Sequence, residues 1–380
     1  MWIAAALAQA AGSRIATPFS TRAPAAVPSI SERANRAFEY AVDLCERRLS
    51  GDGNGSATLQ HVPELLAQVF QADFDVSLAY CQRAATNVTC LCPKAGANGQ
   101  GLLDKPLIEF QCEQTDEGRR QCADGGCSAA CSRVLLGNFA SPEECEALVR
   151  GVDSLTAPAS QREECTLDLS ELCATGDVRT TLLFLRLLER LRRMVAHEYG
   201  LPIDGLITQS AFTSRIPHVA GRDNYGALHA DESSSEHFHY SAVLHLHSRG
   251  DGFTGGDFVF SDAHRVTDGL AADGLSVEDD SDAQRTLTRV APLQGRAVMF
   301  SSGWENVHYV DSVRSGVRFS LPVFFRARPM EAVDGGGEAV ANDHTLEMCR
   351  WLSHTWDTPE AFAQLQQDVF GNHESVVMSS

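Results

Sequence analysis

The chain contains 380 residues, carries a formal net charge of -19 at pH 7, and is 43% hydrophobic and 21% charged. This length allows one large core, or one core with a smaller module, and the composition is that of an ordinary globular protein. The negative charge argues against a nucleic-acid partner, because phosphate-backbone binding requires clustered Lys and Arg. No apolar run reaches the roughly 18 residues of a membrane-spanning helix, so no membrane span is expected.

Residues 1–30 are interpreted as a candidate signal segment and linker. The short apolar run Trp2–Leu7 precedes Ala8-Gln9-Ala10, which fits a small-x-small cleavage site, although no Lys or Arg stands before the run. Glycosylation acceptors of the Asn-x-Ser/Thr type follow at Asn54 and Asn87. Together these features favour the secretory pathway, with the endoplasmic reticulum lumen as the expected location, although the C-terminal residues are not a luminal retention signal.

Nine of the 12 cysteines lie in the first 145 residues, from Cys45 onward. Their spacing lacks the paired Cys-x-x-Cys knuckles of a structural zinc site, so disulfides in an oxidising compartment are favoured over zinc. Apolar periodicity predicts helices over 36–49 and 61–80, and the Gly-, Cys- and Asn-rich stretch 84–131 is expected to be a loop. Residues 31–131 are therefore predicted to form a small cysteine-rich helical module.

A second unit is predicted from 133 to 328, and its first half is helical. Ser141 and Glu144 have the spacing of a helix capping box. A longer helix is expected over 178–199, with Gly200 as its C-terminal cap. The charged face of this longer helix is expected to be solvated, and it comprises Arg186, Glu189, Arg190 and Arg193.

After Pro202 the apolar periodicity changes to two, which predicts strands. The acidic loop 268–282 is expected to be too polar to fold alone. Many short strands joined by Gly-rich turns, with helices grouped before them, indicate an α+β fold with a double-sheet barrel or jelly-roll core supported by helices. One or two short helices are expected in the tail, 331–380. The candidate strands are 206–216, 227–231, 240–247, 257–261, 286–290, 296–301 and 317–326.

His229 and Asp231 form a candidate metal-binding pair. On a predicted strand, side chains two positions apart leave the same face, so an imidazole and a carboxylate can bind one ion. A third ligand from elsewhere would complete the two-His, one-carboxylate arrangement of non-haem Fe(II) oxygenases, which leaves open positions for a keto acid and O2. The His-x-Asp triplet alone is a weak signal. Its context strengthens it, because His308 follows a strand and a turn, and Arg318 is expected on the adjacent antiparallel strand.

Arg318 is a natural bidentate partner for a carboxylate, and Ser320 shares its face of the strand as a second donor. The histidines of 237–247 could form a second metal site, but side chains that line a polar barrel interior, or that are merely half-buried, are the favoured interpretation. Gly-x-Ser-x-Gly and Gly-x-x-x-x-Gly-Lys motifs are absent from the sequence, so serine hydrolase and P-loop readings have no support.

Several stretches of the second unit resemble one known family, the 2-oxoglutarate-dependent prolyl hydroxylases. Within that family the sequence is most similar to the collagen prolyl 3-hydroxylases of the leprecan group. The resemblance covers about 133 to 328 and is strong over the second half. It is carried by Gly295–His308 with Gly316-Val317-Arg318, by Tyr240–Leu244, by Phe253–Phe258 with its Gly-Gly turn, and by Phe139–Cys145.

This resemblance implies a double-stranded β-helix (jelly-roll) domain that uses Fe(II), the co-substrate 2-oxoglutarate and O2, with ascorbate also expected. The implied substrate is a proline-containing polypeptide, with 3-hydroxylation favoured over prolyl 4-hydroxylation, lysyl hydroxylation or a small-molecule target. A non-catalytic module that binds Pro-rich peptides is the alternative from another class. A family tyrosine that helps to bind the co-substrate falls at His245 here. The implied metal ligands are His229, Asp231 and His308, and the implied co-substrate contacts are Arg318, Ser320, His245 and Tyr225.

Overall fold

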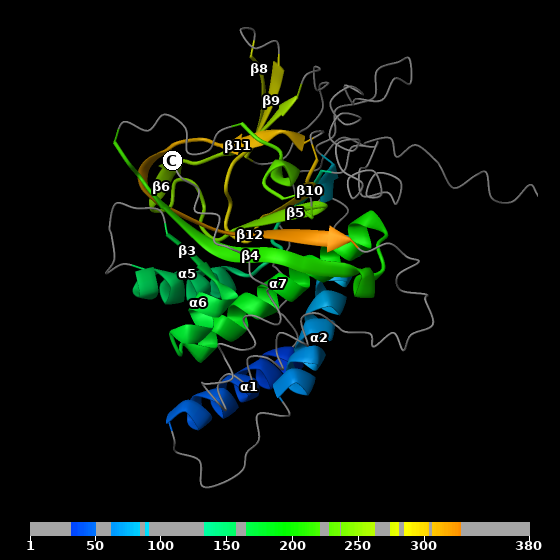
Figure 1. The fold of residues 1–380 in the computed structure, drawn as a ribbon, viewed down its shortest axis with the longest axis vertical. Coiled ribbons are helices and arrows are strands. Elements are labelled where there is room, and N and C mark those ends of the chain that lie inside the picture. The colour runs from blue at the N-terminus through cyan, green and yellow to red at the C-terminus, as the bar shows by residue number, and fades with distance from the viewer. Residues whose placement is uncertain are drawn as a thin grey trace, which may run out of the picture.

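Two antiparallel β-sheets lie face to face in the structure, a computed structural model, and the helices cover the outer face of the larger sheet (Figure 1). This arrangement confirms the predicted α+β class with a jelly-roll core and supporting helices. The candidate signal segment and the C-terminal tail lie outside the described residues. The structure describes residues 32–50, 62–83, 88–90, 133–156, 165–220, 228–235, 237–262, 274–280, 285–303 and 306–327.

The helix layer contains the helices that apolar periodicity predicted. The capping box is also confirmed, because the Glu144 backbone N–H donates to Ser141 Oγ at 3.2 Å and the Ser141 N–H donates to Glu144 Oε2 at 3.0 Å. Gly200 ends the helix over 178–199 at φ 66°, a left-handed conformation that glycine adopts without steric cost. The helices are α1 (Glu32–Ser50), α2 (Val62–Arg83), α5 (Pro142–Thr156), α6 (Leu169–Ala174) and α7 (Val178–Tyr199).

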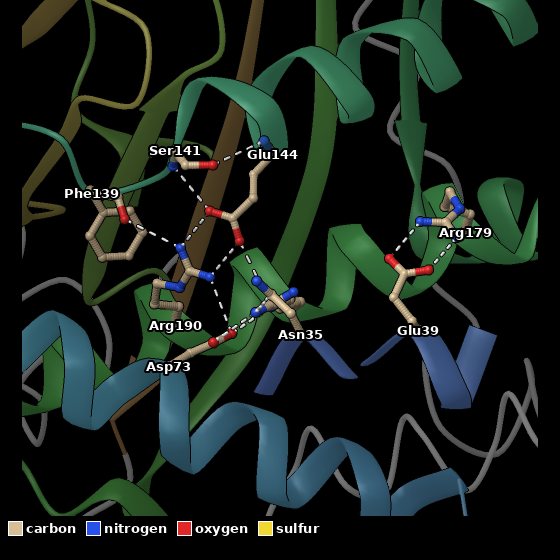
Figure 2. A network of polar contacts seen from close by, with 9 residues as sticks. Asn35, Glu39, Asp73, Phe139, Ser141, Glu144, Arg179 and Arg190 are labelled. Atoms are coloured by element: carbon tan, nitrogen blue, oxygen red, sulfur yellow. Dashed lines mark hydrogen bonds and ion pairs between the residues drawn. The ribbon is translucent and has the colours of Figure 1, made fainter. Parts of the chain in front are cut away.

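The charged face of α7 is buried, which corrects the expectation that it faces solvent. Arg186 and Arg190 are 3% and 2% exposed. They donate hydrogen bonds to Asp73 of α2 at 2.6 Å and 3.1 Å, and Arg190 also donates to Glu144 of α5 at 2.7 Å (Figure 2). Buried charges are tolerated when they are paired, and here the paired carboxylates come from other helices. The pattern within α7 alone therefore could not reveal that this face is covered.

Helices α1 and α2 share the hydrophobic core of α7. Phe38 and Val42 of α1, and Phe70 of α2, belong to the same buried cluster as Leu187 of α7. The ion pairs of Asp73 join the same layer of helices. The described part of segment 31–131 thus packs directly against the second unit, and its status as a separate module stays a prediction.

The cysteine expectations are corrected at one position. Cys145 is a free, buried thiol of α5, and burial, reinforced by the charge of Glu144, raises its pKa to about 12. A disulfide at Cys145 is therefore wrong, because its sulfur is unbonded in the structure. Within 84–131, expected to be a loop, Val88–Cys90 form the short strand β1. The cysteines at 92, 112, 122, 127 and 131 lie outside the described residues, so their disulfides stay a prediction.

The larger sheet is built around β12 (Val313–Ala327), which pairs with β4, β5 and β6. Its path runs β1-β2-β10-β5-β12-β4-β3, with β6 beside β12. Its central strands are buried on both faces: Leu244 of β5 packs toward the helices, whereas Val243 packs toward the smaller sheet. The remaining bounds are β2 (Val134–Leu136), β3 (Cys165–Asp168), β4 (Leu206–Pro217), β5 (Tyr240–His245), β6 (Phe253–Gly255) and β10 (Ala297–Ser301).

The smaller sheet has the order β11-β7-β9-β8 and lies over the larger sheet (Figure 1). Part of the stretch 268–282, expected to be a loop, is strand β8, because residues 275–280 pair along their length with β9. A polar sequence is tolerated there because β8 is an edge strand. Of the helices described, none is long and apolar enough to cross a membrane. The strands are β7 (Phe258–Asp262), β8 (Leu275–Asp280), β9 (Arg285–Val290) and β11 (His308–Val310).

Candidate metal centre

His229, Asp231 and His308 meet at one point, although they come from two separate segments. Each offers one ligand atom, and these atoms lie within 4.8 Å of one another. Asp231 Oδ1 is 3.4 Å from Nε2 of His229 and 3.5 Å from Nε2 of His308. Among the residues that the structure describes, this is the one cluster of His, Cys, Asp and Glu with the spacing of a metal site.

The backbone at His229 differs from the predicted strand over 227–231. His229 forms an isolated antiparallel bridge with His308, with N–H···O distances of 3.0 Å and 2.8 Å, and Asp231 begins a short 3-10 turn, η3 (Asp231–Ser233). The bridge brings the two imidazole centroids to 4.5 Å from each other. Pairing with a distant segment, and not the two-residue period of a strand, therefore brings the three side chains together.

His308 is held in one tautomer by its backbone neighbour. Its Nδ1 lies 2.8 Å from the carbonyl oxygen of Asn306. A carbonyl oxygen can only accept, so Nδ1 carries a hydrogen and Nε2 is the ring nitrogen directed at Asp231. Phe258 stacks on the imidazole with the ring centroids 4.8 Å apart. This is the tautomer and ring orientation that a metal ligand binding through Nε2 requires.

Asp231 is buried and held by hydroxyl groups. Ser241 Oγ donates to Asp231 Oδ2 at 2.6 Å, and Ser302 Oγ lies 2.7 Å from Ser241 Oγ. Burial raises the pKa of the Asp231 carboxyl, but the charge of His308 and hydrogen bonds from His229, His308 and Ser241 outweigh burial and bring that pKa well below its usual range. The group is therefore an ionised carboxylate at neutral pH, with Oδ1 directed at both imidazoles.

Among the three described side chains of the cluster, His229 is the exposed one. Asp231 and His308 are buried, whereas the His229 side chain is 38% exposed. The neighbouring Leu228 is an exposed apolar side chain. A reactant can therefore approach the cluster from the His229 side.

Arg318 is a buried cation fixed by two hydrogen bonds. Its Nε donates to the Gly256 carbonyl at 3.1 Å, and its Nη1 donates to Ser320 Oγ at 3.0 Å, so the predicted shared face of Arg318 and Ser320 is confirmed. Gly256 has φ +69°, and a Cβ there would lie 2.9 Å from Arg318 Cδ, so glycine is required on both grounds. One expectation is wrong: β12, which carries Arg318, pairs in the larger sheet, whereas His308 begins β11 of the smaller sheet.

His245 lies on the same face of the larger sheet as Arg318. It is the direct cross-strand partner of Ser320, and it is fully buried. Neither ring nitrogen has a hydrogen-bond partner among the described residues. Burial, together with the charges of Arg318 and Arg296, brings the pKa of His245 well below its ordinary value of 6.5. His245 is therefore a neutral imidazole with unused hydrogen-bonding capacity beside a buried cation.

One predicted co-substrate contact cannot be placed, and the other histidines of 237–247 have contacts of their own. Tyr225 lies outside the described residues. His239 Nδ1 instead accepts a hydrogen bond from the backbone of Ala327. His247 packs edge-on against Phe319. No second metal cluster of these histidines is found within the described ranges.

The residues present fit the ligands of a non-haem iron site. Two imidazole nitrogens and one ionised carboxylate oxygen are the donor set of the facial Fe(II) arrangement. The two buried ligands are each oriented by a hydrogen bond from outside the cluster, as is usual around protein-bound metals. The unpartnered imidazole of His245 beside Arg318 is a second feature that suits an anionic ligand.

Comparison with known families identifies a 2OG-Fe(II) oxygenase domain within this chain. Residues 216–326 match the family model of the 2OG-Fe(II) oxygenase superfamily, which confirms the resemblance at the level of this domain. The human 2-oxoglutarate and iron-dependent oxygenase domain-containing protein 3 is 27% identical over 150 residues, covering 38% of this chain and 40% of the relative. Human prolyl 3-hydroxylase 2 is 27% identical over 233 residues, covering 52% of this chain and 30% of the relative.

The solved structures that align with this chain include a Pseudomonas putida prolyl-4-hydroxylase. It is 19% identical, and the alignment covers 53% of this chain and 95% of the structure with a TM-score of 0.34. The matches to the two human relatives span less than half of the length of either one.

Sequence reasoning missed the residues that support the ligands. Ser241 donates a hydrogen bond to Asp231 and contacts Ser302, and the Asn306 carbonyl accepts a hydrogen bond from His308. Asn306 stands inside the Gly295–His308 stretch that carries the family resemblance, which was a signal for it. Ser302 stands in the same stretch, and Ser241 stands in Tyr240–Leu244, which also carries the resemblance. The contacts of both serines nevertheless depend on how β5 and the end of β10 approach η3.

Proposed function

We propose that this chain is an Fe(II)- and 2-oxoglutarate-dependent dioxygenase that hydroxylates a proline in a polypeptide substrate, with 3-hydroxylation favoured. The observation that carries the proposal is the convergence of His229, Asp231 and His308 in a jelly-roll domain that also buries Arg318. In this proposal the three residues are the metal ligands, and Arg318 is the anchor for the co-substrate.

The metal role of the triad is supported by its protonation and geometry. Asp231 is ionised, His308 directs Nε2 at the cluster, and the three ligand atoms are close enough to share one ion. When bound, Fe(II) together with 2-oxoglutarate and O2 supplies the oxidising chemistry that converts a C–H bond to C–OH, with succinate and CO2 as co-products. The protein orients the reactants, which can reach the centre beside the exposed His229 side chain.

The co-substrate role is supported by the cluster around Arg318. Its guanidinium is held by Gly256 and Ser320, so it is already oriented to pair with a carboxylate. His245 can donate one N–H to the same anion, taking the role that a tyrosine hydroxyl has in the family. His245 and Ser241 stand four residues apart on the same face of β5, roughly 13 Å at 3.3 Å per residue. One strand thus connects the proposed co-substrate anchor with the residue that supports Asp231.

The choice of proline as target rests on the relatives that are named prolyl 3-hydroxylases, at about a quarter sequence identity. The same centre would also suit prolyl 4-hydroxylation, lysyl hydroxylation or a small-molecule substrate. The secretory location, the use of ascorbate, and glycosylation at Asn54 and Asn87 belong to the same proposal. A non-catalytic module that binds Pro-rich peptides is disfavoured by the complete triad and by Arg318.

The test is turnover with defined peptides. The full chain is incubated with Fe(II), ascorbate, 2-oxoglutarate and Pro-rich peptides, and both succinate and peptide mass are measured. We expect peptide-dependent succinate release and a gain of one oxygen on proline, with fragmentation distinguishing 3- from 4-hydroxyproline. His229→Ala should abolish both signals, whereas His197→Ala on the exposed side of α7 should abolish neither. Absence of succinate under all these conditions would overturn the proposed enzyme.

A further inference from the structure

A buried chain of contacts runs from Arg133 to His308. Arg133 immediately precedes β2, is 1% exposed, and donates from Nε to Asn306 Oδ1 at 2.6 Å. Asn306 is also buried, and its backbone carbonyl is the acceptor for His308 Nδ1. The side chain of Asn306 is therefore braced by an arginine 173 residues away in the chain, and its main chain sets the tautomer of His308.

The Asn306 amide is fixed in one orientation. Its Nδ2 donates to the carbonyl and to the hydroxyl of Ser301, at 2.8 Å and 2.9 Å, while its Oδ1 accepts from Arg133. Exchanging the amide O and N would place an N–H against the arginine donor and an oxygen against the Ser301 carbonyl, so that orientation is excluded. The Asn306 backbone N–H donates to Gly303 at 2.9 Å, which ties the main chain of the same turn.

Arg133 also contacts Phe260, a second residue that lies against His308. Its guanidinium carbon lies 4.2 Å from the ring centroid of Phe260, and Phe260 is the cross-strand partner of His308 between β7 and β11. The Phe260 and His308 rings meet edge to face, 6.1 Å apart. One buried cation thus supports both the hydrogen-bonding partner and the packing partner of the same imidazole.

We infer that Arg133 and Asn306 are positioning residues that hold His308 Nε2 toward the metal. This inference rests on the proposed function, because it assumes that His308 is a metal ligand. Neither side chain touches the cluster of ligand atoms, so both act through His308. Outer hydrogen-bond partners of metal-bound histidines typically account for about 10- to 100-fold in metal affinity.

The experiment is a titration of the apo protein with Co(II), an optical probe for the iron site, on wild type and six variants. Arg133→Met and Asn306→Ala should each weaken Co(II) binding by about 10- to 100-fold and alter its visible absorption. Because the two residues form one chain of contacts, the loss of Co(II) affinity in the double variant should be no greater than the larger of the two single-variant losses. Arg215→Met is the matched control: Arg215 is also a buried arginine, it pairs with Asp153 in the helix layer, and its loss should leave Co(II) binding unchanged.

Circular dichroism shows whether Arg133→Met folds. If it does not, Arg133→Lys takes its place in the titration. Lysine retains the charge and one donor, but it lacks the planar group that lies over Phe260, so we expect affinity between wild type and one-tenth of wild type. Losses that add in the double variant, or Arg133 variants that match wild type, would overturn the inference alone. Wild-type protein that fails to bind Co(II), or that binds it unchanged in His308→Ala, would overturn the proposed metal site together with the inference.

Discussion

Ser241 of β5 donates a hydrogen bond of 2.6 Å to the Oδ2 atom of Asp231, ten positions earlier in the chain. The bond holds one carboxylate oxygen away from the cluster, so that the other, Oδ1, faces both imidazoles. The Ser302 hydroxyl is hydrogen-bonded to the Ser241 hydroxyl. The orientation of the one acidic group in the proposed metal site is therefore set by the neighbouring sheet.

Ser241→Ala is expected to weaken metal binding by about 10- to 100-fold, because Asp231 loses the charge-assisted hydrogen bond that orients it. Co(II) titration of the apo protein measures the change. Thr156→Ala, which removes a buried hydroxyl bonded to Val152 within α5, is the control and should leave metal affinity unaltered. Equal affinities for the two variants would contradict the role given to Ser241.

Arg318→Met is expected to raise the Kd for 2-oxoglutarate by roughly 10- to 150-fold, the equivalent of about 1.5–3 kcal/mol for hydrogen bonds to a charged group. Arg318→Lys should recover part of this loss, because it restores the charge without the planar fork. Calorimetric titration of the metal-loaded protein measures both values. Metal affinity should not change in either variant, and a loss of metal binding would show that Arg318 supports the fold of the centre and not the co-substrate.

His245→Gln is expected to flatten the dependence of stability on pH. The pKa of His245 in the folded protein lies well below 6.5, whereas the unfolded chain takes up a proton near that ordinary value. The unfolded state therefore binds more protons as the pH falls below about 6.5, so the wild-type free energy of unfolding declines there and is undiminished above it. Urea denaturation between about pH 5 and pH 8 measures the slope. Parallel curves for wild type and variant would contradict the prediction.

Asp73→Ala is expected to lower the free energy of unfolding by about 3–5 kcal/mol, because it leaves the buried guanidinium groups of Arg186 and Arg190 short of a partner. The exposed pair Arg179–Glu39 also joins α7 to an N-terminal helix, and it is drawn beside the buried network in Figure 2. Glu39→Ala should cost less than about 1 kcal/mol, because solvent screens that pair. Chemical denaturation measures the free energy of unfolding of both variants. Similar losses would contradict the conclusion that the buried pairs of Asp73 stabilise the fold more than the exposed pair of Glu39.

Local patterns in the sequence determined a large part of the fold. The three predicted long helices, the Ser141–Glu144 capping box, the Gly200 cap and most strands of the jelly roll are present. Each depends on periodicity or on hydrogen bonds between residues a few positions apart, which neighbouring residues decide. The sequence also singled out His229, Asp231, His308 and Arg318 before their geometry was known, although the argument that His229 lies on a strand was wrong.

Only the tertiary structure decided which surfaces are buried and what supports the site. The charged face of α7 is enclosed because Asp73 lies 117 positions before Arg190 yet contacts it. His229 and His308 meet through a bridge between distant segments, and Arg133 reaches Asn306 across 173 positions. A charge, hydroxyl or imidazole has the same local pattern whether or not a distant partner covers it. Its partner, and hence the free energy of burying it, is therefore defined only when the two sheets and the helix layer are packed together.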